Sequence, residues 1–104
     1  MSVLLEFSMF PTDKGESVSE YVSQVIKVIR DSGMSYQLTP MGTIIETDDL
    51  LQALGVVQVA YNTLEQAGCN RVYSSLKLDI RQGKDGRLQG KLNSIQEKIG
   101  EVNT

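Results

Sequence analysis

Residues 2–10 alternate between two sides, as the pleat of a β-strand requires. One side carries Val3, Leu5, Phe7 and Met9, and the other carries Leu4, Glu6, Ser8 and Phe10. A period of two with β-branched and aromatic members is typical of a strand. The chain is therefore expected to begin with a strand that has one apolar side and one mixed side.

The pattern changes to helical spacing after a turn-rich loop at residues 11–16. Ser17 and Glu20 match a capping box, in which each side chain accepts a backbone N–H from the other residue. Gly33 stands where a left-handed residue commonly ends a helix. The apolar stripe between them comprises Val18, Tyr21, Val22, Val25, Ile26 and Ile29. This spacing predicts the first helix.

Two short strands are expected at residues 36–39 and 43–47, because the intervening Pro40-Met41-Gly42 suits a tight antiparallel hairpin. Thr47 or Asp48 is expected to cap a second helix, and Gly68 to end it. The apolar side of this helix is expected to comprise Leu50, Leu51, Leu54, Val57, Tyr61 and Leu64.

Residues 71–80 alternate again and predict a final strand. Leu88, Leu92, Ile95 and Ile99 predict a largely polar third helix that ends at Gly100. The order strand, helix, strand, strand, helix, strand is that of an α+β, ferredoxin-like βαββαβ sandwich, here with an additional C-terminal helix. The 104 residues are expected to form a single domain, residues 1–104.

Each long helix has one apolar stripe, so both are expected to cover the same side of the sheet. The other side would carry Glu6, Ser8, Phe10, Glu46, Tyr73, Ser75, Lys77 and Asp79, with Leu4 and Ile44 among them. That mixture is too apolar for a solvated surface and too polar for a monomer core. We expect subunits to pair through these sheet faces, as a homodimer or homotetramer, with a ligand between them.

Composition narrows the class of function. The chain contains no histidine and one cysteine, which excludes histidine-based catalysis and ordinary zinc sites within one chain. No catalytic or metal site is therefore expected. The net charge of −3 argues against nucleic acid as a partner. No leader pattern or bilayer-spanning segment is evident, so no membrane association and a cytoplasmic location are expected.

Several short motifs lie in a fixed order along the chain. They are Phe7-Ser8-Met9-Phe10-Pro11, Ser32-Gly33 with Tyr36, Met41-Gly42-Thr43 with Glu46, Gly68 with Arg71, and Lys77-Leu78-Asp79-Ile80-Arg81. This set resembles the thiamine-binding protein family with a ferredoxin-like fold (UPF0045, YkoF-like) over nearly the whole chain. The resemblance implies a binding protein rather than an enzyme, assembled as dimers or dimers of dimers. Its ligand would be thiamine or hydroxymethylpyrimidine, not a cofactor. Many members carry His-Glu where this chain has Tyr61-Asn62.

The residues themselves suit an aminopyrimidine ring. Glu46 can accept a hydrogen bond from the exocyclic amine, and Ser8 or Thr43 can complete the pairing. Tyr73 can stack on the ring or on the cationic thiazolium, and Asp79 can balance the positive charge.

Simpler interpretations stay open for several of these residues. Glu46 and Lys77 could pair across the sheet and leave a polar floor for a ligand. Thr43 could be only a good strand former, and Tyr73 an interface residue. The rival function is a regulatory or purely oligomerising ferredoxin-like module that binds another small metabolite. The expected ligand-binding residues are Ser8, Thr43, Glu46, Tyr73, Lys77 and Asp79.

Overall fold

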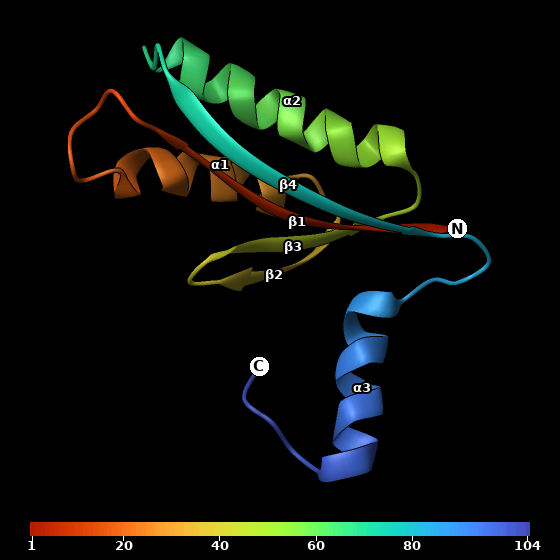
Figure 1. Cartoon of the computed structure of the whole chain (residues 1–104). Helices are drawn as coiled ribbons and strands as arrows, with labels where there is room; N and C mark the ends of the chain where they lie inside the picture. The colour runs from red at the N-terminus through yellow and green to blue at the C-terminus, as the bar shows by residue number, and fades with distance from the viewer.

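The structure, a computed structural model of residues 1–104, contains four strands and three helices in the predicted order (Figure 1). The elements are β1 (Ser2–Pro11), α1 (Ser19–Asp31), β2 (Ser35–Thr39), β3 (Gly42–Thr47), α2 (Leu50–Gln66), β4 (Val72–Arg81) and α3 (Arg87–Ile99). None of the helices has the length and apolar content needed to cross a bilayer.

The strands form one antiparallel sheet in the order β2-β3-β1-β4. Long β1 lies inside the sheet, between β3 and β4, while β2 and β4 form its edges. This arrangement confirms the predicted ferredoxin-like α+β fold.

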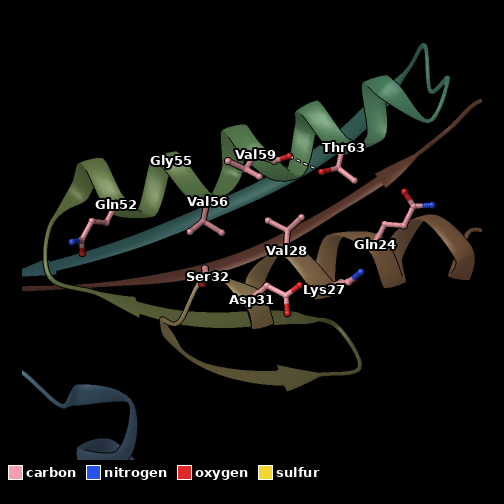
Figure 2. Close-up of a pocket in the computed structure, with 10 residues that line it drawn as sticks. All are labelled: Gln24, Lys27, Val28, Asp31, Ser32, Gln52, Gly55, Val56, Val59 and Thr63. Carbon is pink, nitrogen blue, oxygen red and sulfur yellow. Dashed lines mark hydrogen bonds between the residues drawn. The ribbon is translucent and has the colours of Figure 1, made fainter.

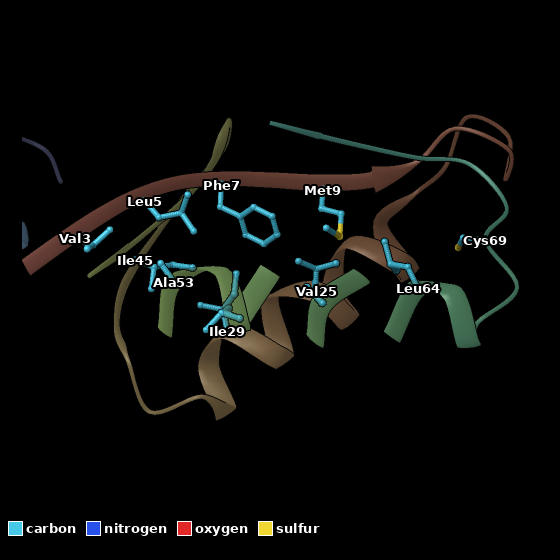
Figure 3. Packing of buried hydrophobic residues seen from close by; sticks show 12 residues of the cluster. Val3, Leu5, Phe7, Met9, Val25, Ile29, Ile45, Ala53, Leu64 and Cys69 are labelled. Carbon is cyan, nitrogen blue, oxygen red and sulfur yellow. The ribbon is translucent and has the colours of Figure 1, made fainter. Parts of the chain in front are cut away.

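Helices α1 and α2 cover the same face of the sheet, as predicted. The side chains of Val3, Leu5, Phe7 and Met9 point from β1 toward both helices (Figure 3). The core cluster comprises these four residues with Val25, Ile29, Ile45, Ala53, Val56, Ala60, Leu64 and Cys69. We call the uncovered side of the sheet the open face.

The N-termini of the two long helices differ from the predictions by one or two residues. Helix α1 begins after Val18, whose carbonyl accepts the N–H groups of Tyr21 and Val22, so the predicted capping box of Ser17 and Glu20 is wrong. Helix α2 is capped by neither Thr47 nor Asp48. The Asp49 carboxylate accepts the Gln52 N–H at 2.8 Å.

The stripe that helix α2 buries agrees with the predicted one only in part: Leu64 is buried, and Leu50 and Val57 pack against the core. Its buried positions are Ala53, Val56, Ala60 and Leu64, and the small alanines let the helix lie close to the sheet. Leu51, Leu54 and Tyr61, which were expected in the core, are exposed. We call these three residues the outer stripe of α2. The helix is therefore apolar on two sides, only one of which meets the core.

Helix α3 stands clear of the rest of the molecule (Figure 1). The radius of gyration is 15.0 Å, whereas a compact chain of this length is expected to have about 13 Å. Ile95 and Ile99, near the far end of α3, are exposed. Only the first turn of this helix is held firmly, at the open face.

Candidate functional site

The open face carries a row of small residues across its middle. Ser8 lies opposite Ser75 in the β1–β4 register. Gly42 of β3 lies beside Ser8: a Cβ placed on Gly42 would stand 3.9 Å from that of Ser8 and only 3.1 Å from the carbonyl oxygen of Phe7. The sheet therefore accepts no larger residue at position 42 without a shift. We call Gly42, Ser8 and Ser75 the serine platform.

Larger side chains border the serine platform on two sides. Phe10 and Tyr73 pair across β1 and β4, with ring centroids 5.6 Å apart and ring planes at 42°. On the opposite side, Glu6 lies between Ile44 of β3 and Lys77 of β4 in the register. The platform is thus a low strip between an aromatic wall and a charged wall, and a planar ring can lie flat on it.

Glu46 lies further along the open face and holds the first turn of α3. Its carboxylate accepts the N–H groups of Arg87, at 3.0 Å, and of Leu88, at 3.2 Å. The residue that precedes α3 is Gly86, which has no side chain to cap the helix. A carboxylate from β3 therefore supplies the cap and the negative charge that a helix N-terminus favours.

This arrangement also settles the alternative partner of Glu46. The strand β1 separates β3 from β4, and no ion pair joins Glu46 to Lys77. Burial of Glu46 raises the pKa of its carboxyl, but the N–H groups of Arg87 and Leu88 and the Ser2 hydroxyl outweigh that effect. The net result is a pKa below the ordinary value, so Glu46 is ionised at neutral pH.

Arg87 also belongs to this site, although no motif or spacing in the sequence pointed to it. Its side chain is 3% exposed and donates to the Ser2 hydroxyl (2.8 Å), the Ser2 carbonyl (2.9 Å) and the Asp79 carbonyl (2.6 Å). It also forms an ion pair with the Asp79 carboxylate at 3.1 Å. Hydrogen bonding from Arg87 lowers the pKa of Asp79, and the charges of Arg87 and Lys91 act in the same direction. Asp79 thus belongs with Glu46 to the base of α3.

Thr43 lies on the other side of the sheet from Ser8 and Glu46. It pairs with Phe7 and is 1% exposed under the helices. Thr43 and Glu46 therefore cannot hold one ring together on the open face, because residues three positions apart on a strand point to opposite faces. Thr43 lines a cavity of about 370 Å³ between α1 and the β2–β3 hairpin, and Ser8 and Gly42 also border this cavity.

A separate groove of about 760 Å³ runs between α1 and α2 (Figure 2). Val28 and Val56 lie at its floor, with Val59 beside them, and polar side chains such as Lys27 and Gln52 surround them. None of the six residues expected to bind ligand lines this groove. Five of the six belong to the open face instead, and Thr43 lines the cavity beside α1.

The sequence profile of thiamine-binding proteins matches residues 5–96, which include most of β1, the other three strands and both core helices. The chain belongs to the thiamine-binding protein family. A UPF0045 protein of Mycobacterium bovis is 38% identical over 99 residues, covering 95% of this chain and 96% of its own length. A UPF0045 protein of Methanothermobacter thermautotrophicus is 36% identical over 83 residues, covering 80% of this chain and 84% of its own length.

A solved structure from the same family supports the fold. The crystal structure of a protein from Methanocaldococcus jannaschii superposes with a TM-score of 0.80 at 36% identity, covering 92% of this chain and 97% of that one. The family is one of small-molecule binding proteins by its description. In this member, the open face divides into the serine platform with its walls and the base of α3.

The docking of α3 is expected to depend on pH. Because the pKa of Glu46 is lowered in the folded protein, its carboxylate stabilises the docked helix above the ordinary value of 4.5. That stabilisation is lost as the pH falls through the lowered pKa. In an NMR titration, the amide signals of Arg87 and Leu88 should shift together with a midpoint below 4.5. Glu46→Gln should abolish this shared transition, and a midpoint at or above 4.5 would contradict the capping role.

Proposed function

We propose that this member of the thiamine-binding protein family binds thiamine, or its hydroxymethylpyrimidine moiety, without turning it over. The ligand would lie on the open face, at or near an interface between subunits in the cytoplasm. The observation that carries the proposal is the family match over residues 5–96, because that range includes every strand that builds the serine platform.

The geometry of the platform suits the flat aminopyrimidine ring. The ring would rest on Ser8 and Gly42, where no bulky side chain rises from the sheet. Tyr73, which is 61% exposed, is free to stack on it or on the thiazolium cation. The Ser8 hydroxyl can both donate to and accept from ring nitrogens and the exocyclic amine.

The acceptor for the exocyclic amine is proposed to be Glu6 rather than Glu46. Both oxygens of Glu46 already accept backbone N–H groups of α3. Glu6 is exposed beside the platform, where no hydrogen bond occupies its carboxylate, and faces Lys77 in the register. The Lys77 ammonium is proposed to change its position with the charge of the ligand, for example by approaching the phosphate of thiamine phosphate. Glu46 and Asp79 would act indirectly, by holding α3 at the end of the site.

A second subunit is needed to enclose the ligand. Binding sites commonly bury 70–90% of a small ligand, roughly, whereas the platform is a shallow strip open to solvent. The apolar side chains of the open face, Phe10 and Ile44 among them, would be buried at the same time. This supports a homodimer or homotetramer joined through sheet faces, with the ligand between the faces.

Calorimetric titration with thiamine, hydroxymethylpyrimidine and thiamine phosphate tests the proposal. We expect saturable binding of at least one compound, and at least a tenfold loss of affinity in Ser8→Tyr, which fills the platform. Ser17→Tyr, in the exposed loop before α1, is the matched control and should bind as the unmodified chain does. Unchanged affinity in Ser8→Tyr would show that the ligand binds away from the serine platform. No heat from a folded oligomer with any compound would favour the purely oligomerising module.

A further inference from the structure

We propose that the end of the sheet beside α3 carries a second binding site, which holds the phosphate group of a small anion. The site is a cavity of about 400 Å³ between α3, the end of β4 and the loop that joins these two elements. Figure 1 shows this loop leading from the end of β4 to α3. On β1, Ser2 lies opposite Arg81 of the cavity and Ser8 lies in the serine platform, so the two sites are about 20 Å apart.

Positive charge is concentrated in this cavity, which we call the basic cavity. The chain has ten lysines and arginines in all and a net charge of −3, yet four of the ten line this one hollow. No aspartate or glutamate lines it, and Ile95 is its one apolar residue. A hollow lined by one sign of charge concentrates the field and attracts ligands of the opposite sign. The four cations are Arg81, Lys84, Arg87 and Lys91.

The carboxylates near the basic cavity leave much of this charge unbalanced. Asp79 forms ion pairs with Arg87, at 3.1 Å, and with Lys91, at 3.5 Å, so one negative charge is shared between two cations. Asp85 pairs instead with the N-terminal amine, at 3.6 Å. The basic cavity therefore keeps a net positive charge when its nearest acidic groups are counted.

Two of the four cations are free to bind a ligand. Arg87 is buried and its guanidinium already donates to Ser2 and Asp79, so it fixes the wall of the cavity. Arg81 and Lys84 are exposed and form no ion pair within the chain. Both side chains line the cavity, one from the last residue of β4 and the other from the following loop.

Helix α3 presents a low and polar surface to the same cavity. Arg87, Gly90, Lys91 and Ser94 recur at the spacing of one helix face and line the hollow together. Glycine inside a helix is destabilising relative to alanine. A Cβ placed on Gly90 meets no atom within 4 Å, so packing within the chain does not require this glycine. Its effect is to keep the cavity open beside the Ser94 hydroxyl, which can donate to an anion.

A phosphate group suits this set of donors. It carries a charge of about −1.5 to −2 at neutral pH and offers several acceptor oxygens. The guanidinium of Arg81 can bind two of these oxygens at once, and the Lys84 ammonium acts as a point charge. Cavities of about 300–1,000 Å³ hold small ligands, so the basic cavity has room for a phosphate ester as well as for free phosphate.

A bound phosphate would also fix α3 against the sheet. Its ligands come from three segments: Arg81 from β4, Lys84 from the loop and Ser94 from α3. Without ligand, the contacts that Glu46 and Arg87 make hold only the first turn of this helix. A ligand that binds only the docked arrangement stabilises it by mass action.

An NMR titration with inorganic phosphate tests the proposal, with no thiamine present and with sodium chloride keeping the ionic strength constant. We expect saturable shifts of the Gly90 and Ser94 amide signals. Lys84→Gln should weaken binding by about fivefold or more, because it removes a charged donor to the phosphate. Lys98→Gln removes the same charge from an exposed position in the last turn of α3, outside the cavity, and is the matched control. Glycerol phosphate, titrated in parallel, should bind more tightly than inorganic phosphate if the ligand is an ester, and more weakly if it is free phosphate.

Gly90→Leu tests the shape of the cavity without changing its charge. Leucine favours a helix, so α3 should keep its circular dichroism while the new side chain fills the hollow and abolishes binding. Hydrogen exchange at the α3 amides should slow when phosphate is added to the unmodified chain. Equal losses of affinity in Lys84→Gln and Lys98→Gln would overturn the site, and so would shifts that do not saturate or full affinity in Gly90→Leu. Phosphate and thiamine are titrated separately, so this proposal and the proposed function can each fail without the other.

Discussion

Replacing Arg87 with alanine is expected to detach α3 from the sheet and to lower the free energy of unfolding by about 2–4 kcal/mol. The side chain is 3% exposed and ties the first turn of α3 to one end of the sheet, through Ser2 of β1 and Asp79 of the neighbouring strand β4. Its removal leaves two strand carbonyls without their donor, and hydrogen bonds to charged groups contribute about 1.5–3 kcal/mol each. The expected loss is below their sum because water enters the exposed end of the sheet.

Chemical denaturation followed by circular dichroism measures this effect, and proton exchange at the α3 amides shows whether the helix detaches. Lys91→Ala is the matched control, because Lys91 approaches the same Asp79 carboxylate at 3.5 Å but is exposed. Lys91→Ala should change the free energy of unfolding little, since exposed ion pairs contribute little to stability. Arg87→Lys should fall between the two, because a single ammonium cannot bridge Ser2 and Asp79 at once. A loss in Lys91→Ala equal to that in Arg87→Ala would contradict the account.

The role of Glu46 shows where sequence reasoning reaches its limit. Alternation correctly placed Glu46 on the open face, and the Gly86-Arg87 start of α3 could have indicated a helix without a local cap. Nothing in the sequence, however, states that the cap comes from a strand more than forty residues earlier. A carboxylate on a sheet face was therefore interpreted as a free acceptor for ligand.

Helix α2 shows a different limit. Its apolar residues were correctly assigned to a helix, but two apolar stripes overlap on it, and the bulkier one was taken for the core. The alanines Ala53 and Ala60 bury completely because they let α2 approach the sheet, and burial depends on distance as well as on hydrophobicity. Leu51 and Leu54 therefore lie outside the core and are exposed. Leu54 and Tyr61 consequently line a hollow that α2 shares with β4.

The face of the sheet to which each residue of β1 points, in contrast, could be derived from the sequence. The two sides of β1 were assigned correctly at every position from Val3 to Phe10, because the period of a strand leaves no freedom once one residue is placed. The same alternation places Thr43 and Glu46, three positions apart on β3, on opposite faces of the sheet. The elements and faces of the open sheet were thus predictable, whereas the partners of its polar groups required the tertiary structure.

Phe7→Ala is expected to have the largest effect on stability, a loss of about 3–5 kcal/mol, because it removes a fully buried aromatic side chain from the centre of the core. A domain of this size should lose more than about 10 °C in melting temperature. Differential scanning calorimetry measures the change. The milder Phe7→Leu should lose less and remain folded at room temperature, which makes it the variant suited to binding experiments.

The contrast between Phe7 and Tyr73 separates the two faces of the sheet. Phe7 points toward the helices, whereas Tyr73 lies on the open face beside the serine platform. Phe7→Leu should therefore weaken folding but leave thiamine affinity within about threefold. Tyr73→Ala should do the reverse, and its melting temperature should stay close to that of the unmodified protein. It should bind thiamine roughly tenfold more weakly, since an aromatic–cation contact contributes about 0.5–2 kcal/mol. If Phe7→Leu lost affinity while Tyr73→Ala kept it, the ligand would lie on the helix side, in the cavity lined by Thr43.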